Sequence, residues 1–272
     1  MTAIAIAAGL LIGVSLGALG GGGSILAVPV FVYALGQSPA AATTGSLVVV
    51  GVSAIAGATV ARRQQHVNLA RGIGFGALGI AGAALGATWS TRVPAHALLA
   101  AFSVVMLIVA AMMIGRQLRH RADTAGEARG PYDEPILRLH PHIMCNCPRA
   151  LKLIVAAVAV GLMTGFFGVG GGFLVVPALV FALGMPMPIA VGTSLLVITI
   201  NSAAALTVRL AAGVQLDWWP VITLTAAAMV GSVFGAWLGR RVDPSRLAWA
   251  FGLLILGVAA YTAWQSATQL IA

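Results

Sequence analysis

The residues of this chain most able to do chemistry are two glycine-rich turns, each followed by hydroxyl side chains at matching positions. The run Gly20–Gly23 returns at residues 168–172, and Pro29 is matched by Pro177. Glycine disfavours a helix interior by about 1 kcal/mol relative to alanine, so these runs predict a break in the helix. Such a break frees backbone N–H groups at the start of the next helical piece, where the helix dipole is positive. The turn can then bind a small anion without a fixed charge.

Neutral hydrogen-bond donors accompany both turns, and Asn201 in the second half corresponds to Ser53 in the first. The candidate substrate-binding residues are Gly22, Gly23, Ser24, Thr43, Thr44 and Ser46 in the first half and Gly171, Gly172, Phe173, Thr193, Ser194 and Asn201 in the second. Packing is the alternative role for each hydroxyl taken singly, because small residues are common where transmembrane helices approach closely. The six acidic residues lie in predicted loops or at span ends, so a proton relay of buried carboxylates is not expected.

The duplication extends through the whole of each half. Positions match at an offset of 148 residues, as in Ser46 and Ser194, and beyond one inserted residue at 149, as in Gly82 and Gly231. A duplicated membrane chain with a glycine-rich break in the same segment of each half indicates a transporter whose site lies between the repeats.

The composition is that of a membrane protein. The chain has 272 residues, of which 60% are hydrophobic and 8% charged, whereas a soluble domain carries about 25% charged residues. The net charge of +9 comes from basic residues that cluster in loops, which is the pattern that orients membrane proteins. No basic stripe or aromatic platform accompanies the charge, so nucleic-acid binding is not expected. We predict an all-α, polytopic protein with the lipid bilayer as its surroundings.

Apolar segments of roughly 20 residues divide the chain into three parts. We predict an N-terminal transmembrane repeat at 3–115, a polar cytoplasmic linker at 116–150 and a C-terminal transmembrane repeat at 151–271. Each repeat has about four hydrophobic segments, and the first is broken at the glycine run. If the broken segment crosses the membrane once, the halves are parallel; if it folds back as a hairpin, they are inverted. The inverted arrangement collects more basic residues on one side, so the positive-inside rule favours it.

Three arginines stand at the ends of the second span of each half: Arg62, Arg63 and Arg209. We expect them to be interfacial charges whose long side chains reach toward water. The alternative is an electrostatic funnel that draws an anion to the mouth of the transport path.

The linker holds a second group of residues able to do chemistry. His140, His142, Cys145 and Cys147 are four soft ligands within a short stretch, and they are weak candidates for a metal site. Their spacing is not that of a standard structural zinc site, and a cytoplasmic loop disfavours a disulfide. Incidental reduced thiols and sulfur or redox sensing are the other interpretations. A membrane redox or metal-handling protein is therefore the alternative function.

The glycine turns and the blocks that follow them resemble the TauE/SafE sulfite exporter family, also called the toluene sulfonate uptake permease family. The resemblance rests on Gly20–Pro29 with Ala42–Leu47, and on Gly168–Pro177 with Ala190–Leu195. It implies a multi-pass permease of a bacterial or archaeal inner membrane, not an enzyme and without a cofactor, that moves small sulfur-containing or organic anions such as sulfite and sulfonates. A homodimer is a further expectation. The His/Cys stretch is not part of the family pattern.

Overall fold

The computed structural model is all-helical over the residues that it describes, which are 2–90, 92–122, 147–168, 171–239, 241–243, 246, 249–250 and 252–260. Its elements are α1 (Thr2–Leu19), α2 (Gly22–Pro29), the π-helical η1 (Val30–Ala34), α3 (Pro39–Arg63), α4 (Leu69–Ser90), α5 (Ala95–Ala122), α6 (Cys147–Phe167), α7 (Gly172–Leu183), α8 (Met187–Ala211) and α9 (Trp218–Gly239). Within the described residues, α3, α4, α8 and α9 are long and apolar enough to cross a membrane. Helices α5 and α6 extend into both ends of the predicted linker.

The glycine runs break the helices where the sequence predicts. Helix α1 ends just before Gly20 and α6 just before Gly168, and both glycines have a left-handed backbone, with φ of 73° and 65°. Helix α2 then returns along α1. This follows from the contact of Gly23 with α1: a Cβ on Gly23 would collide with the carbonyl oxygen of Ile12. In a continuous helix these two residues would lie about 16 Å apart. The first apolar segment therefore folds back as a hairpin and is not one continuous helix. A hairpin is the form on which the inverted arrangement of the halves depends.

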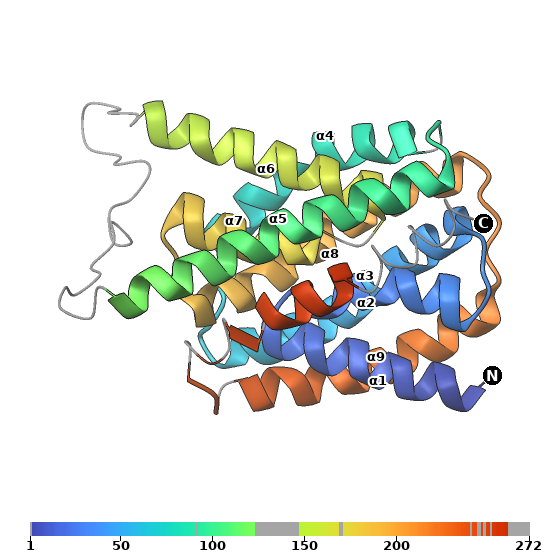
Figure 1. Cartoon of the computed structure of the whole chain (residues 1–272), viewed down its shortest axis with the longest axis horizontal. Coiled ribbons are helices and arrows are strands. Elements are labelled where there is room, and N and C mark those ends of the chain that lie inside the picture. The colour runs from blue at the N-terminus through green and yellow to red at the C-terminus, as the bar shows by residue number, and fades with distance from the viewer. Residues whose placement is uncertain are drawn as a thin grey trace.

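The first helix of each half packs against a helix of the other half. Helix α1 packs mainly against α9, and α6 packs mainly against α4, so each half supports the other's first helix (Figure 1). Glycines line both seams: Gly13 and Gly17 bring α1 onto the backbone of α9, while Gly82 and Gly86 bring α4 onto the backbone of α6. Small residues are the usual means of close approach between helices in lipid, where no hydrophobic force drives the helices together.

Helices α3 and α8, which correspond to each other in the two halves, cross the core in opposite directions. Thr43 near the start of α3 contacts Arg209 near the end of α8. Gly57 near the end of α3 faces Leu195 near the start of α8. Each helix has 25 residues, so this antiparallel pair is long enough to pass through the whole molecule.

Large apolar side chains cover the outside of the helices, and buried hydroxyls and glycines lie among the apolar side chains of the interior. Leu11, Leu85, Trp219 and Val230 are all more than half exposed. A water-soluble protein would bury most side chains of this kind. The apolar exterior and the long helices together describe a multi-pass membrane protein.

The α4–α6 seam gives a test in which two glycines of one helix respond with opposite sign. A Cβ on Gly86 would lie 2.7 Å from the amide nitrogen of Phe166, whereas a Cβ on Gly74 would have nothing within 4 Å. We expect Gly86→Ala to lower the stability by about 1–3 kcal/mol through overpacking. Gly74→Ala should leave the stability unchanged or slightly raised, because alanine is the better helix former. Thermal unfolding of the purified protein in detergent measures both, and equal effects would contradict the seam.

Candidate functional site

The two glycine turns lie against each other in the interior of the protein. A Cβ on Gly172 would lie 2.8 Å from the Cα of Gly21 and 2.9 Å from the Oγ of Ser24. Gly21 and Gly172 are both buried. The first turns of α2 and α7 are therefore neighbours, and the two glycine runs lie together between the repeats.

Ser46 and Ser194 each bind the turn of the opposite half. The Oγ of Ser46 donates a hydrogen bond to the carbonyl oxygen of Gly168, and the Oγ of Ser194 donates to that of Gly20 at 3.0 Å. Both serines are fully buried, and each also lies within hydrogen-bond distance of a carbonyl in its own helix. The pair thus fastens each hairpin to the repeat from which it does not come.

The other predicted hydroxyls bind the backbone of the protein. Ser24 donates to a carbonyl at the start of α2 at 2.7 Å, and Thr44 donates to the preceding turn of α3 at 2.8 Å. Thr193 accepts the N–H of Asn68 at 3.0 Å, which tethers the loop between α3 and α4. In this conformation these hydroxyls shape the backbone around the turns.

The remaining predicted residues near the turns contribute backbone or packing. Gly22 and Gly23 form the first turn of α2. The ring of Phe173, at the start of α7, is fully buried and packs edge-on against Phe102 at 5.8 Å between centroids. Phe173 can therefore offer a substrate only its backbone.

Asn201 is buried with neither atom of its amide hydrogen-bonded within the described part of the chain. The amide of Asn201 lies against Gly79 of α4. Asn201 is one helical turn beyond Ile198, whose terminal methyl would lie 2.8 Å from a Cβ on Gly172. Its counterpart Ser53 instead donates to a carbonyl of its own helix. An unpaired buried polar group costs about 1–3 kcal/mol. Such a group in a native protein points to a water or a ligand in some state of the molecule.

The interpretation of Arg209 as an interfacial charge is wrong, whereas for the exposed Arg62 and Arg63 it stays a prediction. Arg209 is only 3% exposed. Its Nη1 donates to the Oγ1 of Thr43 at 2.7 Å, and its Nη2 donates to the Oγ of Ser90 at 2.8 Å. Nη2 also reaches two carbonyls at the end of α6, and Nε has no acceptor among the described residues.

One signal in the sequence could have identified Arg209. At the offset of 148 residues its counterpart is Ala61, so the second half places a cation where the first half has a methyl group. Within the described ranges no carboxylate forms an ion pair with Arg209. The guanidinium is therefore a buried positive charge held by neutral acceptors, a kind of site that favours a nearby anion.

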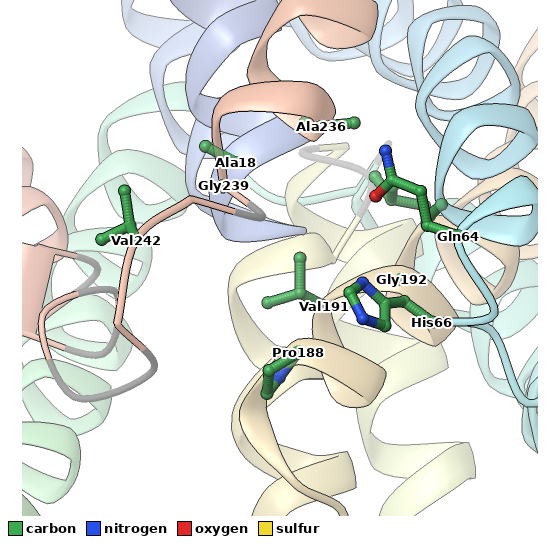
Figure 2. Close-up of a pocket in the computed structure, with 12 residues that line it drawn as sticks. Ala18, Gln64, His66, Pro188, Val191, Gly192, Ala236, Gly239 and Val242 are labelled. Carbon is green, nitrogen blue, oxygen red and sulfur yellow. The ribbon is translucent and has the colours of Figure 1, made fainter.

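A cavity of about 340 Å³ lies at the end of the molecule where α3 and α9 end. Figure 2 shows the side chains of Gln64 and His66 on one wall and Val242 on the opposite wall. Ala18 and Val191 bring the cavity close to the first glycine turn, because a Cβ on Gly20 would lie 2.7 Å from the Cα of Val191. None of the candidate residues from the sequence lines this cavity.

The histidines and the first cysteine of the linker motif, His140, His142 and Cys145, lie outside the described residues. Cys147 is the first residue of α6. The metal interpretation of this stretch stays a prediction.

The exchanged serine bonds predict that two alanine substitutions destabilise the protein together. Ser46→Ala with Ser194→Ala removes the two serine bonds to the opposite turns, at about 0.5–1.5 kcal/mol each. Thr59→Ala with Thr207→Ala is the matched control, because these exposed hydroxyls occupy the same two helices and bind only carbonyls of their own helix. Thermal unfolding in detergent should show the larger loss for the serine pair, and equal losses would refute the bridging role.

Comparisons with known proteins give one consistent result. The family model described as Sulfite exporter TauE/SafE matches residues 5–262. A probable membrane transporter protein of Xylella fastidiosa strain 9a5c is 33% identical over 99% of this chain and 97% of its own length. A protein of the same description from strain Temecula1 is 34% identical over the same shares, and one from Methanocaldococcus jannaschii is 37% identical over 41% of this chain and 43% of its own.

No solved structure matches the chain. The family model nevertheless covers both repeats and both glycine turns, and the Xylella relatives align over almost the full length. This chain belongs to the TauE/SafE sulfite exporter family of membrane transporters.

Proposed function

We propose that the chain moves small sulfur-containing anions, such as sulfite and organosulfonates, across a bacterial or archaeal inner membrane through a neutral donor site between its repeats. The contact of the two glycine turns carries the proposal. A helix N-terminus carries about half a positive charge, and here α2 and α7 bring two such ends together in the interior. An anion relieves the repulsion between them, and glycine lets it approach the N–H groups closely.

The acidic residues of the described part support an anion as the substrate. Asp217 and Asp243 lie just outside the ends of α9 and are exposed, so neither offers a carboxylate to a site between the repeats. The buried cation Arg209 binds Thr43 of the opposite half, and Thr43 lies against Gly168 of the second turn. This balance favours a negative ligand over a metal cation, which would need carboxylates or many carbonyls directed at it.

Inverted repeats form part of the proposal. The antiparallel course of α3 and α8 supports them, since these are corresponding helices of the two halves. Figure 1 supports them too: α1 runs from right to left, whereas its counterpart α6 runs from left to right. Helices α3 and α9 end on the side where α5 ends and α6 begins (Figure 1). The exposed Arg62 and Arg63 lie in the last turn of α3 and the exposed Arg241 follows α9, so the positive-inside rule assigns that side to the cytoplasm.

The membrane potential gives such a carrier a direction. A monoanion that leaves a cell with a negative interior gains about 2.3 kcal/mol per 100 mV. Because the proposed site has no buried carboxylate to couple proton flow, export by facilitated diffusion is the mode that we propose.

Flux of radiolabelled sulfite into proteoliposomes tests the proposal. An imposed interior-positive potential should drive uptake, and reversal of the potential should abolish it, because the carried species is an anion. Unlabelled thiosulfate, sulfoacetate and sulfate serve as competitors that define the substrate class. Absence of sulfite flux at either potential, with correctly inserted protein, would overturn the proposal.

A cysteine variant separates this proposal from the redox or metal alternative. Cys145→Ser with Cys147→Ser should keep the sulfite flux of the unmodified protein, because the proposed site lies between the helices. Loss of flux in this variant, with unchanged stability, would favour a function of the His/Cys stretch.

A further inference from the structure

The cavity at the ends of α3 and α9 corresponds, under the internal repeat, to the place that Arg209 fills, and each place takes residues from both halves. Under the offsets of 148 and 149 residues, the lining residues pair with Arg209 and its hydrogen-bond partners as follows: Ala61 with Arg209, Val191 with Thr43, Gly17 with Gly165, Ala18 with Phe166, and Gly239 with Ser90. The same set of positions thus encloses a cavity at one place and holds a guanidinium at the other.

The side chains around the two places differ in a consistent way. Thr43 and Ser90 supply the hydroxyl acceptors that hold the guanidinium, and their counterparts Val191 and Gly239 supply none. Three positions therefore change together: the cation and both hydroxyls are present on one side and absent on the other. One place is filled by an arginine and its hydroxyl acceptors, and the other is a cavity that has neither.

The two places lie toward opposite faces of the molecule. Thr43 and Ala61 are separated by 18 residues of one helix, which corresponds to about 27 Å. Each place also borders one of the glycine turns: a Cβ on Gly168 would lie 2.5 Å from the Cβ of Thr43, and one on Gly20 would lie 2.7 Å from the Cα of Val191. The paired turns thus stand between an open place and a closed one.

We propose that the cavity is the chamber through which the anion reaches the glycine turns from one face, and that Arg209 closes the equivalent chamber on the other face. The identity of the anion rests on the proposed function, whereas the closure does not. A volume of about 340 Å³ holds a small anion with part of its hydration shell, since one water takes about 30 Å³. Gln64 and His66 supply hydrogen-bond donors on the wall, and Arg63 is exposed beside them.

Opening of the closed chamber requires Arg209 to leave its acceptors on α3, α4 and α6. Its Nε has no acceptor among the described residues in the present conformation. An anion at the turns offers the guanidinium a new partner, so arrival of the substrate from the open side favours release of the arginine. The side chain therefore links occupancy of the turns to opening of the opposite face.

Cysteine accessibility tests the two chambers without any transport measurement. Ala236 lines the open chamber, and Ala87 is its counterpart beside Gly165 at the closed one. In a background with Cys145→Ser and Cys147→Ser, Ala236→Cys should react with a membrane-impermeant thiosulfonate from the face that carries Arg63. Ala87→Cys should be protected from both faces.

Removal of the arginine should open the second chamber. We expect Arg209→Ala to speed the labelling of Ala87→Cys from the opposite face by about tenfold or more. The labelling of Ala236→Cys should stay within about twofold. Equal labelling of the two cysteines with Arg209 present, or continued protection of Ala87→Cys in a folded Arg209→Ala protein, would overturn the proposal.

A second variant keeps the test decisive if Arg209→Ala does not fold. Ala61→Arg places a guanidinium in the open chamber and should slow the labelling of Ala236→Cys and stop sulfite flux; unchanged labelling would contradict the chamber. Ala61→Leu is the uncharged control for bulk. The predicted labelling pattern together with no sulfite flux from the unmodified protein would support the chambers and refute the anion assignment.

Discussion

The backbone of one glycine turn rests on the backbone of the other, and the rest of the structure depends on this contact. No side chain fits between Gly21 and Gly172, so both repeats must supply glycine there. The turns expose carbonyl groups in a region where no bulk water can satisfy them. Ser46 and Ser194 satisfy them from the opposite half, and the seams of α1 with α9 and of α4 with α6 bring the hairpins into position. Neither repeat completes its own turn.

Departures from the sequence match between the two halves carry as much information as the match itself. A perfectly symmetric pair would present the same opening to both faces, whereas a carrier needs one face closed while the other is open. Arg209 against Ala61 and Asn201 against Ser53 break the symmetry inside the otherwise matched helices α3 and α8. Both asymmetric residues are buried and carry polar atoms without a partner in the described part of the chain.

The sequence was sufficient to predict the features that depend on local backbone preference or on the internal repeat. Consecutive glycines predict a helix break from backbone preference alone, and the repeat at 148 residues indicates that the two breaks belong together. The bridging roles of Ser46 and Ser194 were not predictable, because their acceptors are carbonyls of the opposite turn, far away in the chain. The burial of Arg209 depends on acceptors from three other helices, and its position near a helix end is typical of an interfacial charge.

The most direct test of this account compares a glycine of the turn contact with a glycine that meets no neighbour. A Cβ on Gly21 would collide with the backbone of Gly172, whereas a Cβ on Gly74 of α4 would have nothing within 4 Å. The measurement is the initial rate of potential-driven sulfite uptake by Gly21→Ala and Gly74→Ala protein, each checked for a single folded species. We predict near-complete loss of flux for Gly21→Ala and most of the unmodified rate for Gly74→Ala. Equal rates for the two variants would contradict the claim that transport depends on the contact between the turns.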